Sequence, residues 1–159
     1  MTTMTPEQAK TEALARFSDP GPDHLNCAQT MVCFATLTSG WEPDVVTGAR
    51  YFGGGVAGMG ETCGALTGTA LALGLRDMYL GDAVSNDLPD RTRSFLQELI
   101  RDFAAEFGAC RCNDLTGFDL STPEGHDAFM LSEVRQRCQD YVGWMMDQIT
   151  PVLLDSEAV

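Results

Sequence analysis

The glycine-rich run at residues 51–68 constrains the fold of this chain more than any other stretch. It reads YFGGGVAGMGETCGALTG and passes from a group of glycines into Cys63 and then into small residues at helical spacing. Glycine inside a helix costs about 0.5–1 kcal/mol relative to alanine, and the close approach of a second backbone is a reasonable compensation. We therefore predict that a helix over 61–78, thinned at Gly64 and Gly68, lies at the centre of the domain.

Nucleotide, nucleic-acid and membrane functions are disfavoured by this run and by the overall charge. The run lacks the Gly-Lys-Ser/Thr ending of a P-loop, and no β-type run precedes it, as a dinucleotide-binding fingerprint requires. The formal net charge of −13 repels phosphate groups, so we expect no nucleic-acid partner and no binding to an anionic membrane surface. A protein partner with a basic surface is easier to accommodate.

Helix signals recur along the rest of the chain. N-caps, first-turn prolines and terminal glycines predict helices over 5–17, 27–39, about 43–51, 88–107 and at least 127–149. No segment shows clear period-two alternation. We expect an all-α single domain over 1–159, a bundle of five or six helices around the central Gly/Ala-rich helix, with no β-sheet. Its core should span about 5–149, with Thr150 and Pro151 ending the last helix and a frayed tail at 152–159.

The cellular compartment bears on the chemistry of the six cysteines. The first residues show no basic region followed by an apolar stretch, and the longest weakly polar run is shorter than the roughly 20 residues that span a bilayer. We expect a cytoplasmic protein without membrane insertion. In a reducing compartment, cysteines serve more often as thiols, metal ligands or a redox pair than as structural disulfides.

Three of the cysteines stand where sulfur chemistry is favoured, and a fourth, Cys138, is expected in the middle of a helix. Cys27 and Cys63 lie in the first turns of predicted helices, where the helix dipole favours a thiolate. Cys112 lies in a loop beyond a helix, and Cys138 lies on the buried face of the last helix. Four thiolates suit an iron–sulfur cluster or a structural zinc, and two of them could instead form a reversible disulfide.

Spacing alone leaves a simpler interpretation open. The chain has no C-x2-C pair, and the C-x-C at Cys110 and Cys112 is tighter than the usual zinc spacing. Cysteines also pack as small apolar residues. This is our interpretation of Cys33, and it is an alternative for Cys27 and Cys138. His24, three residues before Cys27, is a candidate for an alternative ligand or for a hydrogen-bond donor to a ligand. An exposed loop histidine is more often inert.

The segments around these cysteines carry a family resemblance. Cys63 opens the stretch CGALTG at 63–68. Thr62 stands before this cysteine, and Gly64 stands between it and Ala65. The other cysteines stand in NCAQ at 26–29, CNDLTGFDL at 112–120 and CQDYV at 138–142. Together these segments resemble the C_GCAxxG_C_C family, whose members are classed as redox-active, over about 24–146.

The resemblance implies a small helical protein with a single four-cysteine site and a bound prosthetic group such as an iron–sulfur cluster. The residues that it assigns to the site, as cofactor and metal ligands, are Cys27, Cys63, Cys112 and Cys138. The resemblance assigns Cys112 rather than Cys110 to the site. Cys110 is then either a resolving thiol or a residue without a role in the chemistry.

We expect a redox carrier or accessory protein rather than a stand-alone enzyme, one that passes electrons to a redox partner protein or oxidoreductase. One alternative is a thiol–disulfide oxidoreductase in which Cys63 is the catalytic nucleophile and a second cysteine completes the pair. Another is a non-enzymatic helical adaptor, stabilised by zinc or by packing alone. The glycine-thinned helix face could meet a second subunit in a homodimer as well as the same chain.

Overall fold

The computed structural model describes residues 3–81, 85–155, 157 and 159. In this part of the chain the fold is all-α, as predicted, without a strand. The elements are α1 (Pro6–Ser18), α2 (Cys27–Ser39), the 3-10 helix η1 (Pro43–Phe52), α3 (Gly64–Leu80), α4 (Leu88–Phe107), α5 (Cys112–Thr116), α6 (Pro123–Leu131) and α7 (Val134–Leu154). No helix among the described residues is both long and apolar enough to cross a membrane.

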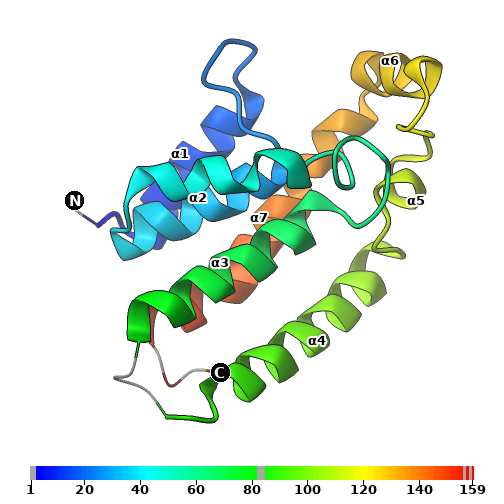
Figure 1. The fold of residues 1–159 in the computed structure, drawn as a ribbon. Coiled ribbons are helices and arrows are strands. Elements are labelled where there is room, and N and C mark those ends of the chain that lie inside the picture. The colour runs from blue at the N-terminus through cyan, green and yellow to red at the C-terminus, as the bar shows by residue number, and fades with distance from the viewer. Residues whose placement is uncertain (1–2, 82–84, 156, 158) are drawn as a thin grey trace.

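Five long helices form the bundle, and the 3-10 helix η1 packs along α2. α2 packs against α1, η1, α3 and α7, and α4 lies against α3 and α7. Figure 1 shows α3 and α7 side by side through the middle of the molecule, with α5, α6 and the loop before α3 at one end. The predicted helices therefore correspond to the five long ones and η1; α6 lies partly within the helix predicted from 127, and α5 is added near the site.

Local signals set the helix ends as the sequence predicts. Thr5 and Gln8 form a capping box at the start of α1, and Asn26 and Gln29 form another at the start of α2. Gly40 ends α2 in the left-handed conformation with a φ of 73°. α2 carries no charged residue and is buried on nearly all sides.

The close approach of α3 to α2 depends on two glycines. A Cβ added at Gly64 would lie 2.8 Å from the Cys27 Cβ and 3.0 Å from the Ala28 nitrogen. A Cβ added at Gly68 would lie 2.6 Å from the Ala28 carbonyl oxygen and 2.9 Å from the Met31 Cβ. The glycine-thinned face of α3 therefore packs against a helix of the same chain.

Two predicted boundaries are wrong. α3 begins at Gly64 rather than near 61, so Cys63 is its N-cap and not a first-turn residue. The predicted helix from 127 is two helices, because the extended backbone of Ser132 (ψ 155°) separates α6 from α7.

The last helix also runs past its predicted end. α7 continues through Pro151 to Leu154, so the first part of the expected frayed tail is helical. Val152 is buried, and its carbonyl accepts a hydrogen bond at 3.4 Å from the buried Arg76 guanidinium. These tertiary contacts favour the last turn over the helix-breaking tendency of proline. Residues 156 and 158 lie outside the described residues.

We predict that Gly64→Ala and Gly68→Ala each lower the free energy of unfolding by about 1–3 kcal/mol, because the added Cβ presses on α2. Gly74 in the same helix has open space around its Cβ position, so Gly74→Ala should preserve stability or raise it by up to about 1 kcal/mol through helix propensity. Urea denaturation of the three variants measures the difference. Equal effects at the three positions would show that close packing does not require Gly64 and Gly68.

Candidate functional site

The four predicted site cysteines lie on four different elements at one end of the bundle. Cys27 is the first residue of α2, Cys63 is the N-cap of α3, and Cys112 is the first residue of α5. Cys138 lies in the second turn of α7. Cys63, Cys112 and Cys138 are buried and Cys27 is half-buried, and none of the six cysteines forms a disulfide in the structure.

Backbone contacts bring Cys63 next to both Cys27 and Cys112. The Gly64 contact described above sets the start of α3 against Cys27. On the other side, the chain around positions 62 and 111 forms one antiparallel bridge. Here the Cys63 N–H donates to the Cys110 carbonyl at 2.8 Å, and the Cys112 N–H donates to the Glu61 carbonyl at 2.6 Å.

The glycine-rich loop is held at both ends by asparagines next to site cysteines. The Asn26 Nδ2 donates to the Arg50 carbonyl at 2.8 Å, and a Cβ at Gly53 would overlap the Asn26 side chain. The Asn113 N–H donates to the Gly60 carbonyl at 3.0 Å, and a Cβ at Gly60 would overlap the Asn113 side chain. The loop therefore connects the start of α2 to the start of α5.

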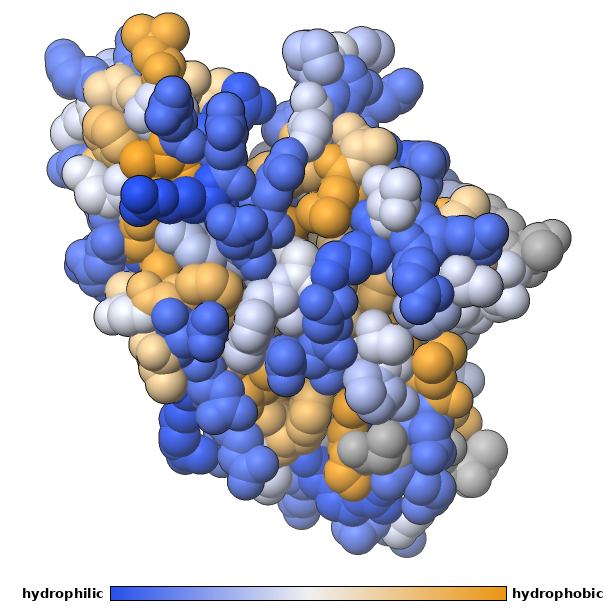
Figure 2. Space-filling model, turned by 180° about the vertical axis from the view of Figure 1, so that it is seen from behind, coloured by the Kyte–Doolittle hydropathy of each residue, from blue (hydrophilic) through white to orange (hydrophobic). Residues whose placement is uncertain are grey.

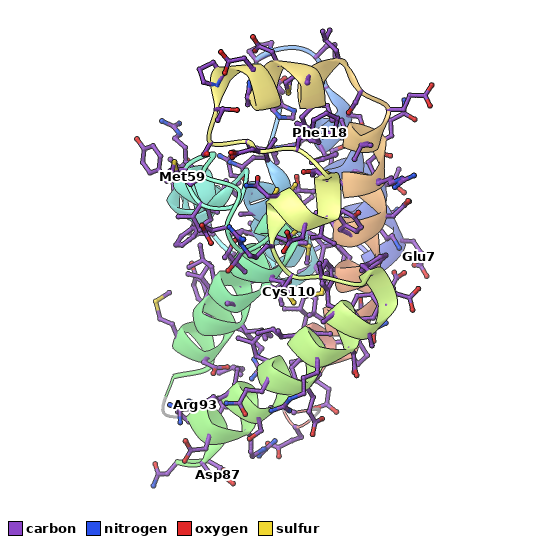
Figure 3. All side chains as sticks on the ribbon, turned by 90° about the vertical axis from the view of Figure 1, so that its right-hand side faces the viewer. Glu7, Met59, Asp87, Arg93, Cys110 and Phe118 are labelled. Carbon is purple, nitrogen blue, oxygen red and sulfur yellow. The ribbon has the colours of Figure 1, made fainter. Side chains whose placement is uncertain are left out.

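The middle of this loop is a left-handed turn. Gly54, Gly55, Val56, Ala57 and Gly58 all have positive φ, between 53° and 74°. Glycine adopts this region freely, whereas a β-branched residue such as Val56 does so at a cost of about 1–3 kcal/mol. Figure 3 shows Met59 at the outer edge of the loop and Cys110 between the end of α4 and α5.

Electrostatic coupling separates the four site thiols from the other two cysteines. Every pair among Cys27, Cys63, Cys112 and Cys138 interacts, and repulsion between their ionised forms opposes the loss of more than one proton. No cysteine affects the pKa of Cys33 or Cys110, which burial raises. Cys33 is a core residue, as predicted. The structure thus brings together the four predicted cysteines and leaves out the two extra ones.

Cys27 and Cys138 are the two thiols that change each other's pKa most. A hydrogen bond between their side chains holds the pKa of Cys27 well above its ordinary value and lowers the pKa of Cys138. The Arg135 guanidinium lowers the pKa of Cys138 further, against the effect of burial. Of these two thiols, Cys27 therefore holds its proton more strongly and Cys138 ionises more readily.

The sequence predicted that the position of Cys63 at a helix N-terminus lowers the pKa of its thiol, and this prediction is wrong. The N–H groups of Ala65 and Leu66 face the Cys63 sulfur and favour its thiolate, without completing a capping hydrogen bond. Burial outweighs them and raises the pKa of Cys63 to about 12. This shift is opposite to the one that a nucleophilic Cys63 needs at neutral pH.

A cavity of about 210 Å³ opens next to three of the four thiols. Its lining residues are Phe17, His24, Asn26, Cys27, Gly54, Gly58, Cys112, Leu120, His126, Phe129, Met130, Arg135 and Cys138. His24, a candidate donor from the sequence, is thus at the cavity and exposed. Cys63 is not part of the lining and lies buried beside it.

Sequence reasoning missed Arg135 and Tyr141, which lie one turn before and one turn after Cys138. The pKa of Tyr141 is raised by burial and then by the proximity of Cys138 and Cys63. Its hydroxyl donates to the Leu115 carbonyl at 3.3 Å. A search for polar residues three positions from each cysteine on a predicted helix would have found both.

The donor set fits a thiophilic metal centre in its chemistry. Four thiols are the ligands that iron–sulfur clusters and structural zinc use, and a cation would offset the repulsion among their thiolates. Across the described ranges, no group of three or more His, Cys, Asp or Glu side chains is already arranged to hold a metal ion.

The raised thiol pKa values predict a loss of stability in alkali. Burial raises the pKa of both Cys63 and Cys112 from 9.0 to about 12, so the folded state keeps protons that the unfolded state releases. For reduced, metal-free protein we expect the free energy of unfolding to fall above about pH 9, by up to about 1.4 kcal/mol per pH unit for each thiol. Denaturation between pH 8 and 10.5 measures the slope, and Cys63→Ser should reduce it. Parallel slopes for the wild type and Cys63→Ser would contradict the shift.

One known family matches the chain. Its sequence model, described as "Putative redox-active protein (C_GCAxxG_C_C)", matches residues 25–151, a range that includes all four site cysteines. No curated protein and no solved structure matches the chain. The match over most of the chain confirms the resemblance of the cysteine segments, and the chain belongs to the C_GCAxxG_C_C family.

Proposed function

We propose that Cys27, Cys63, Cys112 and Cys138 together bind an iron–sulfur cluster and that the protein carries electrons to a partner. The observation that supports this most is geometric: backbone contacts set Cys63 beside Cys27 and Cys112, and one cavity is lined by Cys27, Cys112 and Cys138. Their burial next to one another is costly for free thiolates, and a cluster carries the positive charge that removes this cost.

When bound, the cluster supplies one-electron chemistry, and the protein supplies its ligands and surroundings. The N–H groups of Ala65 and Leu66 face the Cys63 sulfur, and the Arg135 charge acts on Cys138. Hydrogen bonds and positive charge near the ligating sulfurs raise the reduction potential of such centres. Zinc is the alternative occupant of the same four sulfurs, and it would give a structural site without redox activity.

The partner that we propose is a redox protein or oxidoreductase with a basic docking surface. The net charge of −13 favours such a partner, because complementary charge speeds encounter between proteins.

Protein purified without oxygen should be brown and contain iron and acid-labile sulfide. Replacing any one of the four site cysteines by serine should reduce the iron content at least severalfold, because each supplies a ligand. Cys110→Ser is the matched control, since Cys110 is uncoupled from the four, and it should retain the iron. A colourless protein that reconstitution leaves free of iron would refute the cluster, and stoichiometric zinc would support the structural alternative.

A second candidate function, thiol–disulfide exchange, is favoured by the Cys27–Cys138 pair. In this reaction the Cys138 thiolate attacks a disulfide of the substrate and displaces one substrate thiolate. The Cys27 sulfur then attacks the Cys138 sulfur of the mixed disulfide and gives its proton to the substrate sulfur that leaves. The products are a Cys27–Cys138 disulfide and two substrate thiols, the first of which takes its proton from water. The low pKa of Cys138 and the proton held by Cys27 suit these two roles, whereas Cys63 as nucleophile stays a prediction.

Mild oxidation of metal-free protein should link Cys27 to Cys138 if this candidate is correct. Peptide mapping by mass spectrometry identifies the bond, and Cys138→Ser should abolish disulfide reductase activity while Cys110→Ser preserves it. Linkage through Cys63 instead would revive the original choice of nucleophile. Oxidation that leaves all four thiols free would argue against this second function.

A further inference from the structure

The charge and apolar character of the cavity differ from those of the surface around it. Although the chain has 23 acidic and 10 basic residues, no acidic residue lines the cavity, and Arg135 supplies a positive charge. Three other hollows of the described surface all include carboxylates, for example Asp90, Glu7 and Asp19. The cavity is thus a region free of carboxylates on a strongly acidic protein.

The exposure of the lining residues shows which end of the cavity is buried and which end is open to solvent. Cys112 and Cys138 are nearly buried and form its deep end, whereas His24 and His126 are exposed and lie toward solvent. The apolar residues Phe17, Leu120, Phe129 and Met130 form the walls between them. A molecule that enters would therefore pass apolar walls before it reaches sulfur.

A neighbouring groove widens the approach to Arg135. It is lined by residues of the α1 end and of the α6–α7 junction, and it shares Phe17, Met130 and Arg135 with the cavity. This groove also lacks acidic residues. Figure 2, seen from behind the view of Figure 1, shows the surface hollowed between the α6 end of the molecule and the loop after α1.

The Arg135 guanidinium acts on the Cys138 sulfur, and as a lining residue of the cavity it can also meet a ligand that enters there. It forms no ion pair or side-chain hydrogen bond with any described residue, and it is half-buried. The other polar group toward solvent, His126, already faces an acidic neighbour, since its Nδ1 lies 3.6 Å from the Asp127 carboxylate. A guanidinium that is partly shielded from water binds a carboxylate more strongly than one in open solvent.

We infer that this cavity binds a small organic anion, a carboxylate attached to an apolar group, and brings it to the thiol site. Arg135 binds the carboxylate, and the apolar walls hold the rest of the molecule. The volume of about 210 Å³ lies below the roughly 300–1,000 Å³ of sites for drug-sized ligands, so the ligand is small. The inference rests on the proposed function, because it takes the sulfurs at the deep end of the cavity to be the redox site. It adds a class of small-molecule substrate to the protein partner proposed above.

Three molecules of one shape and different charge test the inference: benzoate, benzamide and benzamidine. Titrations followed by NMR on the purified full-length chain, with its iron content recorded, give the three dissociation constants. Benzoate should bind most tightly and benzamidine least, the reverse of the order that a net charge of −13 would impose. Because iron content is measured separately, loss of the cluster and loss of benzoate binding are distinguishable results.

Variants at two arginines of α7 locate the binding. Arg135→Gln should weaken benzoate binding about tenfold and leave benzamide nearly unchanged, since it removes one charge-assisted interaction. Arg135→Lys keeps the charge and should keep the order of the three ligands. Arg137→Gln is the matched control on the exposed side of the same helix and should have no effect. Binding of benzamidine as tight as that of benzoate, or a benzoate preference that survives Arg135→Gln, would overturn the inference.

Discussion

The site depends on the contact between α2 and α3 at Gly64 and Gly68. The two backbones approach so closely there that a single added methyl group would overlap the opposite helix. This contact fixes the N-terminus of α3 beside that of α2, and with it Cys63 beside Cys27. The pairing of the chain around positions 62 and 111 then adds Cys112 to the same place. The fold and the cysteine cluster are therefore consequences of the same packing.

Electrostatics limits what this group of four thiols can do on its own. Buried thiols that lie close together resist ionisation, and the favourable N–H groups at the start of α3 do not overcome this at Cys63. In the Cys27–Cys138 pair, the hydrogen bond between the thiols favours a proton on Cys27 and eases the ionisation of Cys138. A bound cation, or oxidation to a disulfide, would remove the repulsion altogether. Either outcome uses the same arrangement, which suits a protein whose family is described as redox-active.

Much of the fold was predictable because its signals are local. Capping boxes and terminal glycines predicted α1, α2 and α4 closely. The end of α7 was not predictable, because the burial of Val152 and its bond from Arg76 come from tertiary contacts. The choice of Cys112 over Cys110 came from the family resemblance and agrees with the coupling of the thiols. The cavity and the role of Arg135 required the structure, since they depend on how α1, the start of α2, the glycine-rich loop, α5, α6 and α7 are arranged.

The placement of the four cysteines on separate elements has a consequence for the order of folding. Metal sites built on a short knuckle present two ligands before the rest of the domain has folded. Here each sulfur comes from a different helix, and the segments that carry them lie far apart in the sequence. Contacts of this kind form late, after the cost of closing long loops has been met. Occupancy of the site would therefore report that the whole bundle has assembled, and a partly folded chain would offer a cofactor only scattered thiols.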